Sequence, residues 1–162
     1  MSRKRPLSRL KATGRREGGT FFQVPHAVWS HPAFASLSAH ALKLLIDIAG
    51  QYRGHNNGDL EATWSTMSRK RHWKSRDTLG RALGELARTG FLIRTRQGKR
   101  LCGTHEPSLY AVAWWPINVS DKHSMHTLTA PRTWIEISDA EKSKAGTLTV
   151  LGTSPPTRQA GW

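Results

Sequence analysis

The stretch SRDTLGRALGELARTGFLIRTRQG, residues 75–98, carries the two periodicities from which the rest of the fold can be built outward. Its first half has apolar residues at i, i+3, i+4 and i+7, the spacing of one helical face; these are Leu79, Ala82, Leu83 and Leu86. Ser75 is a favoured N-cap and Gly90 a favoured helix stop, so we expect a helix from Ser75 to Thr89. After Gly90 the pattern alternates, which predicts a strand over residues 91–96.

Two more helices are predicted upstream of this stretch. The first begins at Ser38, another good N-cap, and runs to about Tyr52. Its apolar face repeats at the same helical spacing through Ala41, Leu44, Leu45 and Ile48. A shorter helix starts after Thr63 and fades into residues 68–71, and residues 72–74 make a turn before the helix that Ser75 caps.

Further elements are expected on both sides. Residues 20–24 (TFFQV) are typical of a short strand, and residues 27–34 of a helical turn that Pro32 interrupts. Downstream, a loop over residues 97–107 leads to a second strand over residues 108–115. Among the seven tryptophans, Trp64 and Trp114 fall at predicted core positions. For Trp73, beside the turn, the sequence does not decide between the core and stacking on bases.

The positive charge divides the chain into three parts. The whole sequence has 25 Lys and Arg against 11 Asp and Glu, a net charge of +14, which favours a polyanionic partner such as nucleic acid. Residues 1–18 form a basic arm of net charge +6, and residues 19–116 form the folded domain of net charge +7. Residues 117–162, of net charge +1, are expected to be a largely irregular, flexible extension.

Composition argues against several classes of protein. A single cysteine excludes an intramolecular disulfide and suits a cytoplasmic location. No long apolar run or secretory signal is present, so no membrane partner is expected. Carboxylates are too scarce for a typical metal-dependent nuclease, and neither Cys102 with His105 nor His123 with His126 completes a zinc pattern. We therefore expect no enzyme activity, metal or cofactor.

The order of helix, short helix, turn, helix and β-hairpin is that of a winged helix-turn-helix. The fold class that we expect is mainly α with a β-hairpin, in one such domain. Residues 75–98, followed by SLYAVAWWPI at residues 108–117, resemble the recognition helix and wing of these proteins. The longer stretch from Val24 to Pro116, with VPHAVWSHPAFASLS and YRGHNNGDL, is similar to small winged-helix proteins of bacterial phages, plasmids and integrative elements, some related to replication initiators. KRHWK, at residues 70–74, departs from the small-residue pattern usual before the recognition helix.

In a helix-turn-helix the second helix enters the major groove with its first turns against the bases. Arg81 is the best candidate to read guanine, because its fork matches the O6 and N7 acceptors. Arg81 also stands four residues from both Asp77 and Glu85, so surface ion pairs are the competing explanation. Gly80 and Gly84 are costly inside a helix, which suggests close approach of another backbone, from a neighbouring helix or from DNA. The residues expected on and before this helix to contact DNA are Arg69, Lys70, Arg71, Lys74, Ser75, Arg76, Asp77, Thr78 and Arg81.

The hairpin and the arm supply further basic groups. Arg94 and Arg96 are expected to share one strand face, with Lys99 and Arg100 at the loop tip, where they would contact phosphates or instead protect strand edges. The arm residues expected to contact phosphates are Arg3, Lys4, Arg5, Arg9, Lys11, Arg15 and Arg16.

These features favour a double-stranded DNA-binding protein of a mobile genetic element, acting in replication initiation or transcriptional regulation. One alternative is a winged-helix interaction module that inhibits or recruits a nucleic-acid machine, with a protein partner from the replication, transcription or defence machinery. Another is a sequence-blind binder of RNA or single strands, in which Trp73 would stack on bases. The oligomeric state is not determined by the sequence.

Overall fold

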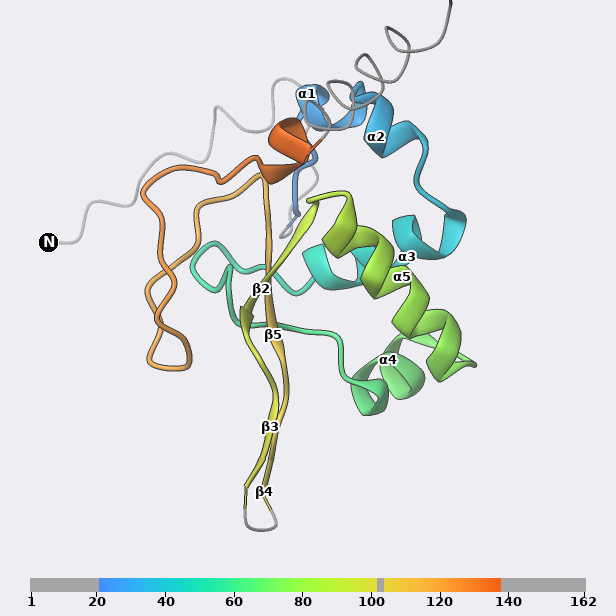
Figure 1. Ribbon diagram of the computed structural model, residues 1–162, viewed down its shortest axis with the longest axis vertical. Coiled ribbons are helices and arrows are strands. Elements are labelled where there is room, and N and C mark those ends of the chain that lie inside the picture. The colour runs from blue at the N-terminus through green and yellow to red at the C-terminus, as the bar shows by residue number, and fades with distance from the viewer. Residues whose placement is uncertain (1–20, 102–103, 138–162) are drawn as a thin grey trace, which may run out of the picture.

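The computed structural model describes residues 21–101 and 104–137 (Figure 1). The helices of this part are α1 (His26–Trp29), α2 (Pro32–Ala35), α3 (Ala39–Ala49), α4 (Trp64–Arg71) and α5 (Arg76–Arg88). The three predicted N-caps are confirmed, because the side chains of Ser38, Thr63 and Ser75 each accept a hydrogen bond from a backbone N–H three residues on. None of the described helices is long and apolar enough to cross a membrane.

The strands form two small antiparallel sheets. The first has the order β1-β5-β2, with β1 (Leu60–Glu61), β5 (Leu109–Val112) and β2 (Leu92–Arg96). The second pairs β3 (Lys99–Leu101) with β4 (Thr104–Glu106). Figure 1 shows that β3 and β4 prolong β2 and β5 into one long hairpin.

Two expectations about these strands were wrong, and one strand was not foreseen. Residues 99–101 and 104–106 are paired strands and not a loop. The two segments that extend β2 and β5 remain within hydrogen-bonding distance of each other. Residues 21–24 form no strand; the segment instead packs Phe22 and Val24 against the core. β1 was not foreseen, because a two-residue strand is too short to show a period in the sequence.

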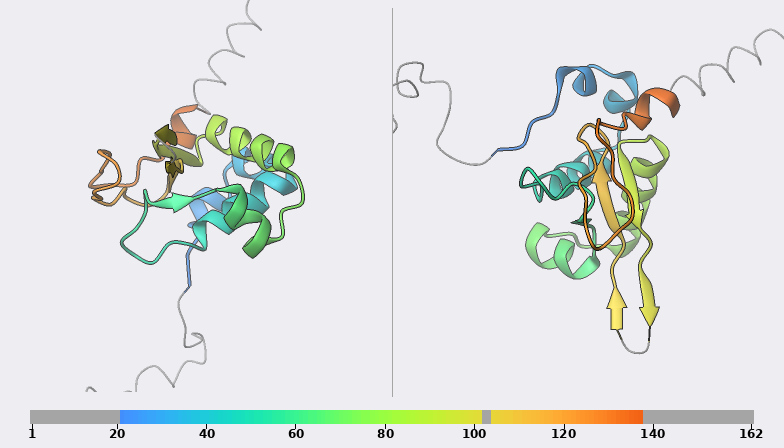
Figure 2. Two further views of the ribbon diagram at one scale, coloured as in Figure 1. Left: turned by 90° about the horizontal axis from the view of Figure 1, so that it is seen from below. Right: turned by 90° about the vertical axis from the view of Figure 1, so that its left-hand side faces the viewer.

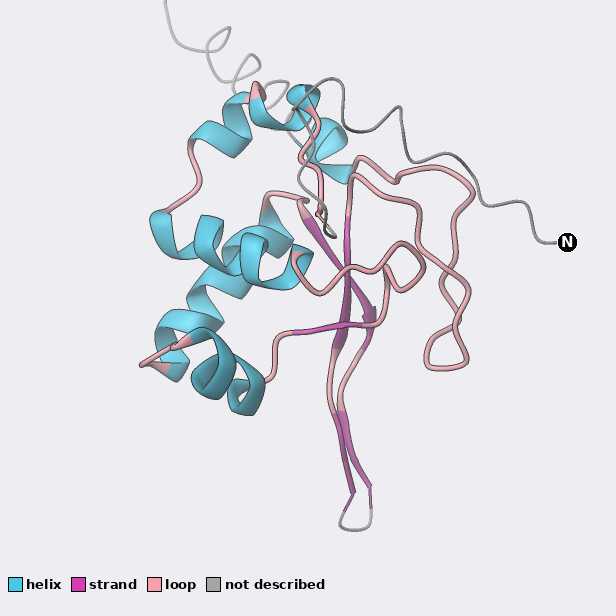
Figure 3. Ribbon diagram, turned by 180° about the vertical axis from the view of Figure 1, so that it is seen from behind, coloured by secondary structure: helices cyan, strands magenta, loops and turns pink. Residues whose placement is uncertain are grey.

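The core lies where α3 and α5 pack on each other and on the three-stranded sheet. Figure 3 shows the helices on one side of the molecule and the strands on the other. The predicted apolar faces are buried: Ala41, Leu44, Leu45 and Ile48 of α3, and Leu79, Ala82 and Leu86 of α5. Trp114 is buried as expected, whereas Trp64 is half-buried at the edge of the core.

A buried asparagine joins the loop after α3 to the end of β5. The Asn57 side-chain amide donates to the carbonyl oxygens of Val112, Trp115 and Pro116, at 3.0, 3.1 and 3.0 Å. Its Oδ1 accepts from the backbone N–H of Val112 at 2.8 Å. Both the nitrogen and the oxygen of this fully buried amide have partners, so Asn57 is a fixed link between distant parts of the chain.

The packed structure extends beyond Pro116, where the sequence placed the end of the domain. Ile117 and Trp134 are both 3 % exposed, and the Trp134 ring stacks on Phe91 with 5.8 Å between centroids. Residues 133–137 are helical, and the Thr133 hydroxyl donates to the carbonyl of Gly90 at 2.6 Å. Part of the expected irregular extension thus covers the end of α5 (Figure 2).

Candidate nucleic-acid interface

Helix α5 separates the core from a polar outer face. Its inner face buries Leu79, Ala82 and Leu86, as the sequence predicted, while Leu83, the fourth residue predicted on this face, is partly buried. Its outer face exposes Asp77, Gly80, Arg81, Gly84 and Arg88. A Cβ added at Gly80 or Gly84 would meet nothing within 4 Å in the described chain. Of the two expected reasons for these glycines, a neighbouring helix is therefore not found among the described residues.

Arg81 makes one of the two ion pairs that its spacing allows. Its guanidinium lies 2.9 Å from the Asp77 carboxylate, and the two side chains are 74 % and 77 % exposed. Such an exposed i,i+4 pair is worth only about 0.3–0.5 kcal/mol, so a phosphate or a base could replace Asp77 at little cost.

Glu85, the other expected partner of Arg81, instead binds the start of α3. Its carboxylate accepts from the backbone N–H and the hydroxyl of Ser38, each at 2.7 Å. Burial raises the pKa of Glu85, but the two bonds from Ser38 outweigh that effect and hold it below its ordinary value. Glu85 thus fixes α5 against α3, which local spacing could not reveal because Ser38 is 47 residues away.

A buried carboxylate holds the end of α4 and the turn before α5. Asp47 of α3 lies 2.6 Å from the Lys43 ammonium and 2.7 Å from the Arg71 guanidinium. It also accepts from the indole N–H of Trp73 at 2.8 Å. We call Asp47, Lys43, Arg71 and Trp73 the Asp47 cluster. Burial raises the pKa of Asp47, but the hydrogen bonds from Lys43, Trp73 and Arg71 outweigh it, so the pKa lies below its ordinary value.

The Asp47 cluster changes the roles expected of two residues. Arg71, expected to clamp a phosphate, already has a carboxylate partner within the chain. Trp73 is only 6 % exposed, and the Lys43 ammonium lies 4.9 Å from its ring centroid. The ring therefore cannot serve as an open platform for a base. The sign of this cluster in the sequence was an acidic residue, Asp47, close to the apolar face of the helix that Ser38 caps.

The other basic residues of α4 and of the turn are exposed. Arg69 and Lys70 lie on α4, and Lys74 lies in the turn that leads to α5. Arg76 is exposed at the start of α5, and its guanidinium carbon lies 5.4 Å from the centroid of the Trp64 ring. Ser75 caps α5 by accepting from the backbone N–H of Thr78 at 3.3 Å.

The hairpin does not present Arg94 and Arg96 alike. A register shift between them interrupts the pairing of β2 with β5, so their expected common face is broken. Arg94 is exposed, whereas Arg96 is half-buried and donates to the carbonyls of Pro107 and Lys122 at 3.1 and 3.4 Å. Arg96 therefore holds the base of the hairpin. Lys99 and Arg100, expected at a loop tip, lie exposed on β3.

Several of the exposed basic side chains come from elements that lie towards one end of the described structure. Arg53, Lys122 and Arg132 are also exposed but do not belong to those elements. Figure 1 shows α4, the start of α5 and the β3–β4 hairpin in the lower half of the molecule, and the right-hand view of Figure 2 also has α4 and the hairpin there. We call this region the basic end; its members are Arg69, Lys70, Lys74, Arg76, Arg81, Lys99 and Arg100, while Arg94 is exposed on the adjoining strand β2. The seven arm residues, Arg3, Lys4, Arg5, Arg9, Lys11, Arg15 and Arg16, lie outside the described part.

No group of three His, Cys, Asp or Glu side chains is placed to hold a metal ion within residues 21–101 and 104–137. His123 is almost fully buried beside Asp59, with 3.6 Å between Nε2 and the carboxylate, while His126 is exposed. Cys102 lies outside the described residues.

No family model, curated protein or solved structure matches this chain.

Proposed function

We propose that this protein is a winged helix-turn-helix protein that binds double-stranded DNA through its basic end. The order α3, β1, α4, α5, β2, β5 and the sheet order β1-β5-β2 support this proposal, because they suit a helix-turn-helix followed by a β-hairpin wing. α4 and α5 would be the two helices of the motif, α5 the recognition helix and β3–β4 the wing.

The observation that carries the proposal is the placement of exposed basic side chains on three elements towards one end of the described structure. A duplex presents phosphates along both strands, so a protein that spans a groove needs cations on either side of its recognition helix. Arg69 and Lys70 would serve on α4, and Lys99 and Arg100 on the hairpin. Arg81, with an easily displaced partner, would reach the bases.

The test is a binding series with a labelled duplex and its separate strands, over about 50–200 mM salt. We expect tighter binding to the duplex, with an affinity that falls steeply as salt rises. The double variant K99Q/R100Q should reduce the log–log slope by about 1.8, because each lost phosphate contact contributes about 0.9. The double variant R53Q/R132Q removes the same charge from exposed residues elsewhere and should leave the slope nearly unchanged.

Two outcomes would overturn this proposal. Preference for the single strand would favour the sequence-blind binder, and equal slopes for the two double variants would mean that only net charge matters.

The biological step that we propose is replication initiation or transcriptional control in a mobile element. Comparing duplexes from the genomic neighbourhood with random duplexes tests it, since equal affinity for both would remove sequence-specific recognition.

A further inference from the structure

A basic cleft lies beside the proposed recognition helix, between α3 and the turn that leads into α5. Its volume is about 240 Å³, many times what a single water molecule requires, so it can admit a phosphate group. Its lining residues are His40 and Lys43 of α3, His72, Trp73, Lys74 and Ser75 of the turn, and Thr78 of α5. We call it the α3–α5 cleft.

The lining of the α3–α5 cleft suits an anion. It combines two lysines, two histidines and two hydroxyl side chains, and no acidic side chain belongs to the described lining. The nearby carboxylate of Asp47 is already neutralised, because both Lys43 and Arg71 are paired with it. Lys43 in the lining and Arg71 behind it thus carry two positive charges against one carboxylate, which leaves one positive charge in excess. The start of α5 adds the favourable end of a helix dipole.

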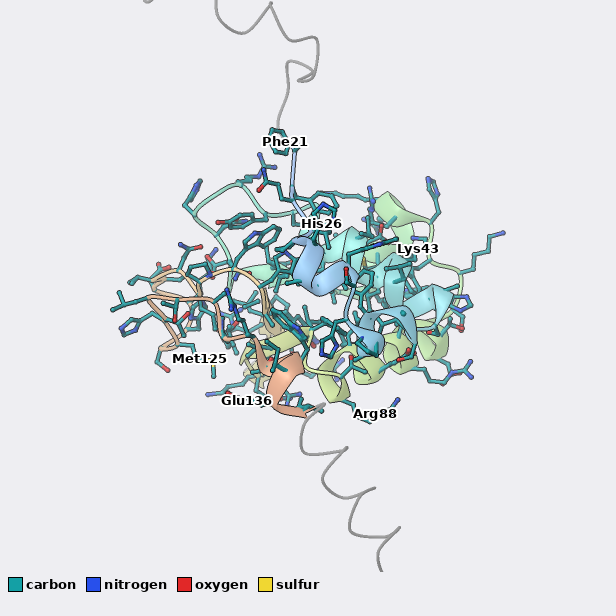
Figure 4. The ribbon with its side chains drawn as sticks, turned by 90° about the horizontal axis from the view of Figure 1, so that it is seen from above. Phe21, His26, Lys43, Arg88, Met125 and Glu136 are labelled. Carbon is teal, nitrogen blue, oxygen red and sulfur yellow. The ribbon has the colours of Figure 1, made fainter. Side chains whose placement is uncertain are left out.

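The walls of the α3–α5 cleft are fixed by contacts within the chain. The Trp73 indole is held by its hydrogen bond to Asp47, and the Lys43 ammonium donates to the backbone carbonyl of Arg71 at 3.0 Å. His72 ends α4 with a left-handed backbone, φ 58°, which sets the course of the turn. A site that exists before its ligand arrives loses less free energy on ordering. Figure 4 shows Lys43 on the opposite side of the molecule from Met125, so the loop around Met125 does not cover this wall.

A second cleft continues along α5 and is a poorer site for an anion. It shares His40 and Thr78 with the first and has a volume of about 340 Å³. Glu85 belongs to its lining, and the pKa of this carboxyl lies below its ordinary value because its bonds from Ser38 outweigh burial. A charged carboxylate in the wall would repel a phosphate, so of these two clefts the α3–α5 cleft is the better phosphate site.

We propose that the α3–α5 cleft binds one phosphate group, and that its occupant is a phosphate of the DNA backbone next to the base pairs that α5 contacts. This assignment rests on the proposed function. Lys74 would supply the charge, and His40 and Ser75 would donate hydrogen bonds. The contact would fix the depth and the angle at which α5 enters the groove, since phosphate contacts position a protein on its duplex.

The first experiment compares K74Q with the control R53Q, and H40Q with the control H55Q. Arg53 and His55 are exposed in the loop after α3 and line neither cleft. K74Q should reduce the salt slope for the duplex by about 0.9 and weaken binding about five- to tenfold at moderate salt, while R53Q should do neither. H40Q should weaken binding more than H55Q does. Thermal unfolding of all four variants checks that each is folded.

The second experiment titrates inorganic phosphate into the wild-type chain and into K74Q, against sodium chloride at equal ionic strength. Nuclear magnetic resonance follows the indole N–H of Trp73 and the backbone N–H of Ser75. Both signals should shift with phosphate in the wild-type chain, and much less in K74Q or with chloride. No shift in the wild-type chain would overturn the phosphate site.

The two experiments separate this inference from the proposed function. If the wild-type chain does not bind the duplex but binds phosphate in the α3–α5 cleft, the DNA function and the assigned occupant are both refuted. The phosphate site itself is then supported. A wild-type chain that binds the duplex, with K74Q equal to R53Q in slope, would leave the DNA function standing. The occupant assigned to the cleft would then be refuted.

Discussion

Helices α3 and α5 each have an aspartate, and the two have different roles because one is buried and the other is exposed. Asp47, on the buried side, has a side chain only 4 % exposed and binds three donors from α3, α4 and the following turn. Asp77, on the open side, is 77 % exposed and binds only Arg81 among the described residues. The first carboxylate is part of the fold, whereas the second can exchange its partner at little cost.

The glycine that follows α5 and the two glycines inside it also differ, because the fold requires only the first. Gly90 has a φ of +76°, and a Cβ there would lie 2.7 Å from the backbone nitrogen of Trp134. Gly80 and Gly84 lie inside the helix with open space where their side chains would be. The fold of the described chain requires glycine at position 90 and has no use for it at the other two positions.

The largest effect is expected from D47A. It leaves Lys43, Arg71 and the indole N–H of Trp73 without their shared acceptor, and breaking a buried ion pair from one side costs about 3–5 kcal/mol. We expect that loss in the free energy of unfolding, measured by urea denaturation. D77A is the matched control and should cost well under 1 kcal/mol. Equal losses would show that burial does not distinguish the two carboxylates.

The pH dependence of stability gives a second measurement on Asp47. Its pKa in the folded chain lies below the ordinary value, so the stability that it contributes is present above the pKa of the unfolded chain. That contribution is lost as the pH falls through the lower, folded pKa. The free energy of unfolding of the wild-type chain should therefore fall more steeply under acid than that of D47A. Parallel curves would contradict the assigned pKa direction.

The next largest effect is expected from G90A. An alanine there would adopt a left-handed backbone, which costs about 1–2 kcal/mol, and its Cβ would push against Thr133 and Trp134. We expect a total loss of about 2 kcal/mol or more, seen as a lower Tm. G54A is the control, because Gly54 has a φ of +94° but open space around its Cβ. Equal losses for both would mean that residues 133–137 do not pack as described.

The sequence could predict what depends on near neighbours. The N-caps at Ser38, Thr63 and Ser75 and the apolar face of α5 follow from spacings of three and four residues, and all are found. Contacts that join distant positions left no such pattern. Nothing local announces that Asn57 will bond to the end of β5, or that Trp134 will stack on Phe91.

The same limit applies to the candidate interface. Residue type sufficed to propose Arg69, Lys70 and Lys99 as basic groups for DNA. It could not tell them from Arg71 and Arg96, which have the same charge but hold carboxylate or carbonyl oxygens of the chain itself. A pattern of charges shows how many cations an element has, while the packing of other elements decides which of them stay free.

A smaller effect, of opposite sign, is expected from G80A and G84A. Each should raise the free energy of unfolding by about 0.4–1 kcal/mol, because alanine favours a helix and meets no atom of the described chain. If these glycines allow close approach to DNA, each variant should bind the duplex more weakly despite its greater stability. The control for stability is A87G, at an exposed position of the same helix, which should lower the free energy of unfolding. Unchanged duplex affinity in both G80A and G84A would remove the close-approach explanation.

The smallest change in stability is expected from D77N. It removes an acidic residue from the first turn of α5 and its pair with Arg81, which together should cost about 0.5 kcal/mol. Duplex affinity should nevertheless rise severalfold, because a carboxylate leaves the basic end and Arg81 is freed for DNA. D121N, at an exposed aspartate of the loop after β5, should leave both quantities nearly unchanged. Weaker binding by D77N would mean that Asp77 itself accepts from a base, as aspartate does from the amino group of cytosine, and that Arg81 has the lesser part in recognition.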